Sequence, residues 1–271
     1  MGEHDGRVAL VTGGSQGIGE GIALALARQG SAVVVHGLTQ DFADQTVGAI
    51  VAAGGRAIGV AGAISDPETS RAAVAAAVRE YGRLDTLVTS AGIQRYGDVV
   101  STPESVWDEV FDVNVKGVYL SAHFALPHLR VSPAGSVVIV SSAQATATQN
   151  QVAAYSSSKG ALNALARAMA VDEAEFGIRV NSVSPGSVDT PMLRASAKLF
   201  GDGSDAGIER VLANWGTSHA LGRIAQPAEI GEVVSFLTST RASFVTGSEV
   251  RVDGGLLARI AAALPMPEEP K

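Results

Sequence analysis

The sequence predicts a single α/β domain over residues 1–271, built on a doubly wound parallel sheet of about seven strands with helices on both faces. Short β-branched runs alternate with helix-forming stretches along the chain, and glycine or proline bounds most of them. The length suits one large domain, and no change of composition marks a second one. Because parallel strands end at a common edge, we expect a ligand site at their carboxyl ends.

The individual elements follow from apolar periodicity and from the residues that interrupt it. Strands are expected at 8–11, 32–35, 57–61, 84–89, 136–140, 178–183 and 248–252. Helices are expected from the turn after the first strand to near residue 30, and then at 42–53, 67–81, 115–126, 155–176 and 228–237. Pro127 is expected to kink or end the fourth helix, because proline lacks a backbone N–H.

The first strand leads directly into a glycine-rich turn and a helix. Glycines there permit a tight turn and let backbone N–H groups approach a pyrophosphate at the positive end of the helix dipole. A glycine cluster alone is a weak signal, but here the flanking strand and helix are both expected. The phosphate site is expected to involve Gly13, Ser15, Gln16, Gly17, Ile18 and Gly19.

Composition excludes several classes of partner. The formal net charge of −7 argues against nucleic acid or an anionic membrane as the main partner. The chain has no Cys, and its five His residues lack carboxylates at metal-ligand spacing, so we expect neither disulfides nor a metal site. No apolar run approaches the ~18 residues of a membrane span, and the N-terminus lacks the pattern of an export signal. A cytoplasmic protein without a membrane partner is therefore expected.

Tyr155 and Lys159 place a phenol and an ammonium on one helix face. A Tyr hydroxyl titrates near pH ~10 in water, so it exchanges protons near neutrality only if a nearby positive charge favours the phenolate. Ser142 follows the fifth strand, where its hydroxyl could hold a carbonyl oxygen beside the phenol. Taken alone, Tyr155 and Lys159 could equally be a solvated pair on a helix.

Several motifs occur in an order and at a spacing that resemble the short-chain dehydrogenase/reductase family over nearly the whole chain. They are the glycine turn, Asn114, Ser142, Tyr155-x-x-x-Lys159 and Pro185-Gly186. The resemblance implies a Rossmann-like fold, a nicotinamide cofactor (NAD or NADP) and a small-molecule alcohol or carbonyl substrate. It also implies a homotetramer built on the two long helices that follow Val106 and Tyr155.

The resemblance also implies roles for individual residues. Tyr155 would be the general acid/base, and Lys159 would lower the Tyr155 pKa and hold the nicotinamide ribose. Ser142 would steady the substrate oxygen, and Asn114 would keep a water in a proton relay, although a helix-bend or capping role is the ordinary interpretation of Asn114 alone. Thr190 would bond the nicotinamide carboxamide. The same cofactor region would include Pro185, Gly186 and Val188.

Two departures from the family pattern lie after the third and fourth strands. Ser90-Ala91-Gly92 stands where the family often has Asn-Ala-Gly, so a hydroxyl replaces a side-chain amide. Ala63-Ile64 stands where many members have Asp-Val, which removes a carboxylate expected to bond the adenine amino group. Both segments are still expected to line the cofactor site.

The third departure bears on the choice between NAD and NADP. Gly37 occupies the approximate place of the acid that binds the adenosine ribose. The only expected partners for the 2′-phosphate of NADP are His36 and the hydroxyl of Thr39, and Gln16 is not the basic residue of many NADP-dependent members. Either cofactor is therefore compatible with the sequence.

Two segments lack regular periodicity or end the chain. Residues 189–222 contain several glycines among apolar residues and follow a strand end, which favours a mobile substrate lid over an ordinary excursion. In the tail, residues 256–271, Leu264 belongs to a helical apolar pattern that ends before Pro265 and Pro267. That tail is expected either to pack on a neighbouring subunit or to fray.

The loop after Ser142 is rich in amides and hydroxyls. If these groups face the site they suit a polyhydroxylated substrate, because a buried amide without a partner costs ~1–3 kcal/mol; otherwise they face solvent. The leading hypothesis is oxidation or reduction of a sugar, a polyol or a related secondary alcohol. The expected substrate contacts are Ser142, Gln144, Gln149, Asn150, Tyr155 and Met192.

Two alternatives stay open at this point. The chain also resembles a 3-oxoacyl carrier-protein reductase, for which Arg130, Arg167 and Arg179 are candidate docking residues, although the overall acidity disfavours an acidic carrier. A non-catalytic cofactor-binding protein is the alternative from another class, since fold does not imply function.

Overall fold

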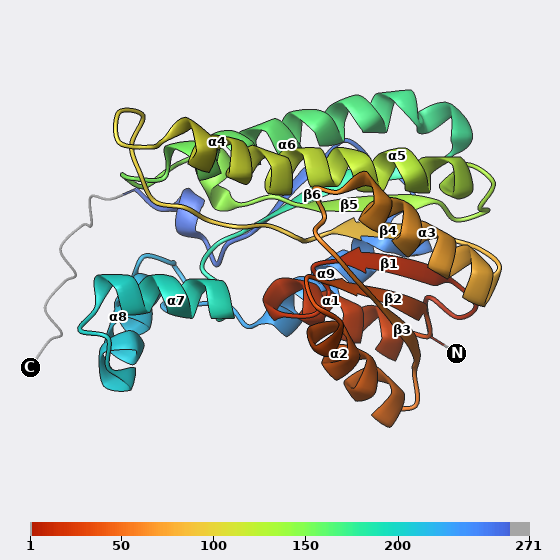
Figure 1. The fold of residues 1–271 in the computed structure, drawn as a ribbon, viewed down its shortest axis with the longest axis horizontal. Coiled ribbons are helices and arrows are strands. Elements are labelled where there is room, and N and C mark those ends of the chain that lie inside the picture. The colour runs from red at the N-terminus through yellow and green to blue at the C-terminus, as the bar shows by residue number, and fades with distance from the viewer. Residues whose placement is uncertain (1, 261–271) are drawn as a thin grey trace, which may run out of the picture.

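The computed structural model describes residues 2–260 and confirms a single Rossmann-like α/β domain (Figure 1). Its seven strands are all parallel and lie in the order β3-β2-β1-β4-β5-β6-β7, so the strand order reverses between β1 and β4. The strands are β1 (Val8–Thr12), β2 (Ala32–Gly37), β3 (Arg56–Ala61), β4 (Thr86–Thr89), β5 (Ser136–Val140), β6 (Arg179–Pro185) and β7 (Glu249–Val252). In doubly wound sheets the crevice at such a reversal is where ligands bind.

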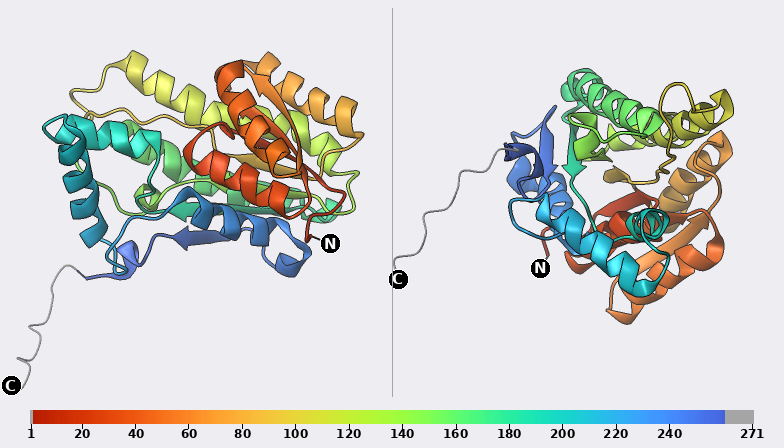
Figure 2. Two further views of the ribbon diagram at one scale, coloured as in Figure 1. Left: turned by 90° about the horizontal axis from the view of Figure 1, so that it is seen from below. Right: turned by 90° about the vertical axis from the view of Figure 1, so that its left-hand side faces the viewer.

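Helices cover both faces of the sheet, as Figures 1 and 2 show. One face carries α1 (Gly17–Arg28), α2 (Gln40–Ala52) and α9 (Pro227–Thr238). The other carries α3 (Pro67–Tyr81), α4 (Glu104–Phe111), α5 (Gly117–Leu129) and α6 (Ala153–Asp172). The remaining pair, α7 (Pro191–Phe200) and α8 (Asp205–Thr217), lies beyond the carboxyl ends of the strands, on the left in Figure 1.

The two faces of the sheet form two separate apolar cores. In β1, Leu10 packs into the core beneath α3, α5 and α6, whereas Val11 packs into the core beneath α1, α2 and α9. Both side chains are fully buried. A central parallel strand that is covered on both faces must be apolar at every position, which explains the uninterrupted β-branched runs of the sequence.

Two helix predictions differ from the structure in detail. Pro127 lies inside the last turn of α5, which continues to Leu129, because a proline near a helix end removes a single intrahelical hydrogen bond. The helix that carries Tyr155 ends at Asp172 rather than at residue 176, and a 3₁₀ turn (Ala174–Phe176) follows it.

Residues 189–222, which lack regular periodicity in the sequence, contain α7 and α8, and the substrate lid expected there stays a prediction. Thr190 Oγ1 accepts the backbone N–H of Leu193 at 3.1 Å and caps α7, with proline in the first turn. Ser204 Oγ accepts the N–H of Gly207 at 3.0 Å and caps α8. These two capping residues were the local signal for helices that the glycines obscured.

The predicted C-terminal tail is described only in part. Leu256–Ala258 form a 3₁₀ turn. The remainder of that tail, with Leu264, Pro265 and Pro267, lies outside the described residues. Among residues 2–260, no helix is both long and apolar enough to cross a membrane.

Candidate active site

The glycine turn after β1 lies against the ends of β4 and β6. Gly13 has φ +64°, and a Cβ added there would lie 2.6 Å from the backbone nitrogen of Ala91, just after β4. Gly17 has φ +54°, and a Cβ there would lie 3.0 Å from Cγ2 of Thr190, after β6. Side chains at these positions are excluded both by the backbone conformation and by the close approach. Segments distant in the sequence therefore meet at the point where the strand order reverses.

The N-terminus of α1 leaves backbone donors available. Among the described residues no side chain caps this helix at Gln16, whereas the Asp66 carboxylate accepts the N–H of Glu68 at the start of α3. Ser15 and Ile18 are half-buried beside the turn, and Gln16 is exposed. Unpaired N–H groups at the positive end of a helix dipole suit an anionic phosphate, as the glycine pattern predicts.

His36 is held inside the fold. Its Nδ1 accepts the N–H of Gly13 at 3.2 Å, and its Nε2 lies 3.1 Å from the carbonyl oxygen of Gly62, to which it donates. Burial lowers the pKa of the ring, so the neutral tautomer with hydrogen on Nε2 fits both contacts. The expectation that His36 meets a 2′-phosphate is therefore wrong, because neither ring nitrogen is free. The exposed hydroxyl of Thr39 remains beside Gly37.

The segments after β3 and β4 lie at the same edge of the sheet. Ile64 is buried, and a Cβ added at Gly117 would lie 2.8 Å from its Cγ2, so its side chain packs against the start of α5. Ala63 is exposed. The backbone N–H of Ser90 donates to the carbonyl oxygen of Thr12 at 3.0 Å, which continues the sheet beyond β4. Backbone contacts thus position this strand end where the family often uses an amide side chain.

Asn114 joins the loop after β4 to the start of α6. It lies fully buried in a π-helical turn (Asp112–Lys116) between α4 and α5. Its Oδ1 accepts the N–H of Ile93 at 2.8 Å, and its Nδ2 donates to the carbonyl oxygen of Ile93 at 2.9 Å and to Ser158 Oγ at 3.0 Å. Asn114 accompanies a widened helix, as its helix-bend interpretation expects, whereas its place in a water relay stays a prediction. A Cβ added at Gly92 would lie 3.3 Å from Asn114 Oδ1 and 3.6 Å from Lys159 Nζ.

Ser142, Tyr155 and Lys159 meet at the end of β5. The Lys159 ammonium is buried, donates to the carbonyl oxygen of Val140 at 2.9 Å, and lies over the Tyr155 ring, 5.6 Å from its centroid. Ser142 Oγ accepts the backbone N–H of Gln144 at 3.1 Å, and this bond does not use the hydroxyl hydrogen of Ser142, which can donate to Tyr155 or to a substrate oxygen. The solvated helical pair considered for Tyr155 and Lys159 is therefore wrong.

Burial controls the protonation of this group. It raises the pKa of Tyr155, an effect opposed by hydrogen bonding with Ser142 and reinforced by the neighbouring Tyr96. In the protein alone desolvation therefore raises the pKa of Tyr155 overall, and its lowering by Lys159 stays a prediction. Burial also lowers the pKa of the Lys159 ammonium to about 8, so its charge is present at neutral pH and lost in mild alkali.

The segment after β6 lies beside these residues. The N–H of Gly186 donates to the carbonyl oxygen of Val252, and a Cβ added at Gly186 would lie 2.7 Å from His219 Nε2. Val188 is buried and forms an isolated parallel bridge with Ala225. Thr190 uses its Oγ1 as an acceptor in capping α7, so its hydroxyl hydrogen is free to donate. Pro185 ends β6 and is buried.

The predicted substrate residues do not converge as a set. Gln149 and Asn150 are exposed, whereas Gln144 is half-buried and its Oε1 lies 3.4 Å from Ser156 Oγ. Met192, in the first turn of α7, is 38% exposed. Gln149 and Asn150 therefore face solvent, as the second interpretation of this loop expected. A polyhydroxylated substrate was inferred from amides facing the site, so that inference loses most of its support.

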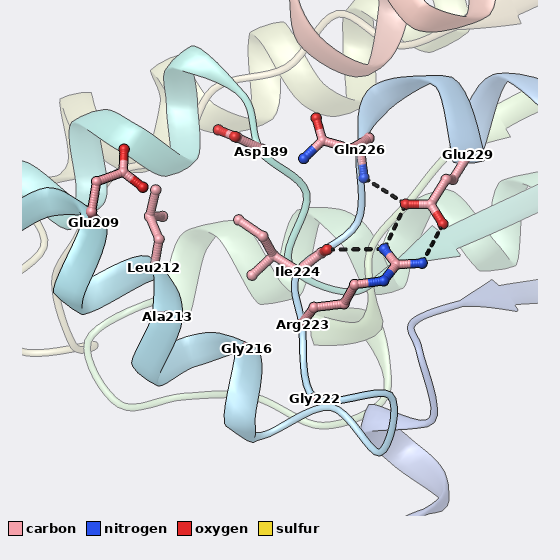
Figure 3. A pocket seen from close by; sticks show the side chains of 10 residues that line it. All are labelled: Asp189, Glu209, Leu212, Ala213, Gly216, Gly222, Arg223, Ile224, Gln226 and Glu229. Atoms are coloured by element: carbon pink, nitrogen blue, oxygen red, sulfur yellow. Dashed lines mark hydrogen bonds and ion pairs between the residues drawn. The ribbon is translucent and has the colours of Figure 1, made fainter.

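A cavity that does not include Tyr155 lies beside α8. It has a volume of about 760 Å³ and lies between α8 and the segment at 222–229 (Figure 3). Arg223 donates to both carboxylate oxygens of Glu229 across one side of it, at 2.7 and 2.8 Å. Asp189 and Glu209, on the other side, are both paired with Arg194. The charges around this cavity are thus already paired within the protein.

Sequence reasoning gave no individual role to three residues on and around α7. Tyr96 lies between β4 and α4, Phe200 ends α7, and their rings are in contact. Arg194 bonds Asp189 and Glu209 and so ties α7 to its neighbours. The position of Tyr96 shortly after a strand end was the one available signal, because neither aromatic residue belongs to a recognisable motif. No group of metal-ligating side chains occurs in the part of the chain that the structure describes.

The sheet order, the glycine turn at its reversal and the Ser, Tyr and Lys at one strand edge define an oxidoreductase of the Rossmann type. The chain belongs to the short-chain dehydrogenase/reductase family. The family model described as enoyl-(acyl carrier protein) reductase matches residues 13–257.

Individual relatives are similar over almost the whole chain. A cyclopentanol dehydrogenase of Comamonas sp. is 38% identical over 95% of this chain and 100% of its own length. A cyclohexanol dehydrogenase of Acinetobacter sp. is 36% identical over 93% of this chain and 95% of its own. The ligand-free structure of an aldohexose dehydrogenase from Thermoplasma acidophilum is 35% identical, with a TM-score of 0.88 over 97% of this chain and 98% of that one.

The buried ammonium predicts a specific pH dependence of stability. The pKa of Lys159 is about 8 in the folded protein against an ordinary 10.5, so between these values the unfolded chain binds more protons. Stability therefore rises with pH in this window, by about 2 kcal/mol from pH 7.5 to 9.5 relative to Lys159→Met, which has no such group. Urea unfolding of both proteins at the two pH values measures this difference. If the difference in unfolding free energy between the two proteins were the same at both pH values, Lys159 would not be buried as an ammonium.

Proposed function

We propose that this protein transfers a hydride between NAD or NADP and a secondary alcohol or ketone, with Tyr155 as the proton donor and acceptor. The observation that carries the proposal is the meeting of Ser142, Tyr155 and the buried Lys159 ammonium beside the glycine turn. A phenol, a hydroxyl donor and a positive charge at one strand edge are the groups that a carbonyl oxygen needs as it gains negative charge.

The residues present fit a nicotinamide dinucleotide. The turn at Gly13 and Gly17 excludes side chains, and the first turn of α1 offers backbone N–H groups to a pyrophosphate. Thr190, with a free hydroxyl hydrogen, would bond the carboxamide, and Lys159 would hold the ribose. When bound, the nicotinamide supplies or accepts the hydride. The adenosine would lie beside Gly37, Ala63, Ile64 and Ser90 to Gly92.

The proton chemistry then follows from the protein. Ser142 donates a hydrogen bond to the substrate oxygen, and its orientation is set by the N–H of Gln144. Tyr155 is a neutral phenol at pH 7, as its ordinary pKa near ~10 already requires and as burial reinforces, so it is ready to donate to a ketone oxygen. The Lys159 ammonium stabilises the phenolate that remains, as long as the pH stays below about 8. Asn114 holds Ser158 and Ile93 and so positions the helix turn that carries Tyr155 and Lys159.

For the substrate we propose an alcohol carried on a ring. The named relatives act on cyclopentanol, cyclohexanol and aldohexoses, and a ring CH–OH is common to these substrates. A sugar or polyol, the leading hypothesis from sequence, remains within this class. It no longer rests on Gln149 and Asn150, which are exposed.

The alternatives have weaker support. Of the proposed carrier-docking residues, Arg130 pairs with Glu173 at 2.7 Å, and Arg179 donates to the carbonyl oxygens of Leu237 and Ser239. Two of three arginines are therefore engaged within the fold, which disfavours a 3-oxoacyl carrier-protein reductase. Burying the Lys159 ammonium costs folding free energy, and a non-catalytic role would leave that cost unexplained. The homotetramer stays a prediction, supported by exposed aromatic residues on α4 and α5 such as Trp107 and Tyr119.

Replacing Tyr155 with Phe removes the proton donor while keeping the ring. We expect turnover of a cyclic alcohol, followed by absorbance of the reduced nicotinamide, to fall by about 10² to 10⁴-fold. Cofactor affinity should stay within a few fold. Tyr81→Phe on α3 is the matched control and should leave turnover unchanged. Residual activity within about tenfold of the unmodified protein would contradict the assignment of Tyr155.

Replacing Gly37 with Asp tests the position of the adenosine ribose. A carboxylate there repels the 2′-phosphate of NADP, so the ratio of NADP to NAD affinity should fall by about tenfold or more. A Cβ at Gly37 lies 2.9 Å from Cβ of Ser15, so the substitution also displaces that residue. Gly37→Ala introduces the same crowding without charge and should change both affinities equally. If Gly37→Asp and Gly37→Ala had the same ratio of NADP affinity to NAD affinity, the adenosine ribose would bind elsewhere.

A further inference from the structure

Tyr96 and Phe200 form an aromatic pair between two separate parts of the fold. Tyr96 belongs to the connection from β4 to α4, and Phe200 is the last residue of α7. Their ring centroids are 4.9 Å apart and their planes are at 88°, so the edge of one ring meets the face of the other. This is a favoured geometry for two aromatic rings. The pair joins the loop after a central strand to the helices beyond the sheet edge.

Tyr96 is fixed close to the proton donor. Its neighbour Gly97 donates from N–H to the carbonyl oxygen of Gln151 at 2.8 Å, and the N–H of Ala153 donates to the carbonyl oxygen of Gly97 at 3.1 Å. These bonds hold Tyr96 next to the first turn of α6, which carries Tyr155. The Tyr96 phenol also contributes to the raised pKa of Tyr155, which agrees with their being neighbours. Tyr96 is half-buried, so part of the residue stays accessible.

Phe200 reaches this position from a loosely supported pair of helices. Within residues 2–260, α7 and α8 pack chiefly on each other rather than on the sheet. Behind α8 lies the cavity of about 760 Å³ that separates it from residues 222–229 (Figure 3). Arg194, in the first half of α7, forms an ion pair with Asp189, which precedes the helix. This ion pair lies toward the end of α7 that is opposite Phe200. Even with its contact to Tyr96, Phe200 is 56% exposed.

We propose that Tyr96 and Phe200 determine substrate specificity by closing an apolar wall over the ring of the substrate, in favour of an alicyclic secondary alcohol. The proposal rests on the hydride-transfer function proposed above and names its substrate class. Aromatic edges and faces pack well on C–H surfaces. A hydroxyl facing this wall loses its water without gaining a partner, which disfavours a sugar by about tenfold or more for each such hydroxyl.

Steady-state kinetics with cyclohexanol and with glucose test the wall. Phe200→Ala and Tyr96→Ala should each raise KM for cyclohexanol by about tenfold with little change in kcat. Each should also lower the ratio of kcat/KM for cyclohexanol to kcat/KM for glucose. Leu199→Ala, an equally exposed apolar change on the same helix, should leave KM unchanged. Tyr96→Phe keeps the ring and should keep KM within about twofold. A tenfold rise in Tyr96→Phe would overturn the proposal in favour of recognition through the phenol hydroxyl.

A binding measurement separates this proposal from the function on which it rests. Calorimetric titration of cyclohexanol into cofactor-loaded Tyr155→Phe protein reports affinity without turnover. The same background carrying Phe200→Ala should bind about tenfold more weakly. Equal affinity in the two proteins would overturn the specificity proposal even if the unmodified enzyme oxidises cyclohexanol. If affinity falls as expected but no alcohol is oxidised by the unmodified enzyme, the wall stands and the hydride-transfer function is wrong.

Discussion

The hydrogen bond from the Lys159 ammonium to the carbonyl oxygen of Val140 ties the reactive helix α6 to the end of β5. A buried ammonium is costly unless such an acceptor satisfies it, and the low pKa of about 8 reflects that cost. The same burial raises the pKa of the neighbouring Tyr155. At neutral pH the phenol is therefore neutral, and the Lys159 ammonium beside it still carries its charge. The site combines a proton donor with a charge that stabilises its conjugate base.

The surrounding architecture keeps this pair in place. Asn114 bonds both to the backbone of Ile93 after β4 and to Ser158 in the first turns of α6, so one amide fixes the two segments relative to each other. The glycine turn approaches β4 and β6 so closely that no side chain fits between them. Strand ends, turn and helix start thus form one rigid edge. Beyond this edge lie α7 and α8, which pack chiefly on each other.

Sequence reasoning succeeded where the pattern is local. Buried strands such as Ser136–Val140 are uninterrupted apolar runs, and Tyr155 and Lys159 share a helix face by spacing alone. It failed where long-range contacts decide the outcome. The engagement of both His36 nitrogens with Gly13 and Gly62, and the contact of Tyr96 with Phe200, depend on segments that only the fold brings together. The rise of the Tyr155 pKa by desolvation was missed for the same reason, because burial cannot be read from a four-residue spacing.

The most direct test of the account is the fate of a label on the carbinol carbon. Cyclohexanol deuterated at that carbon is oxidised with NAD or NADP, and the reduced nicotinamide is isolated and analysed by mass spectrometry. If hydride passes directly from the alcohol carbon to the nicotinamide, the reduced nicotinamide carries one deuterium. Reduced nicotinamide without deuterium would contradict direct transfer, and with it the role given to Ser142, Tyr155 and Lys159.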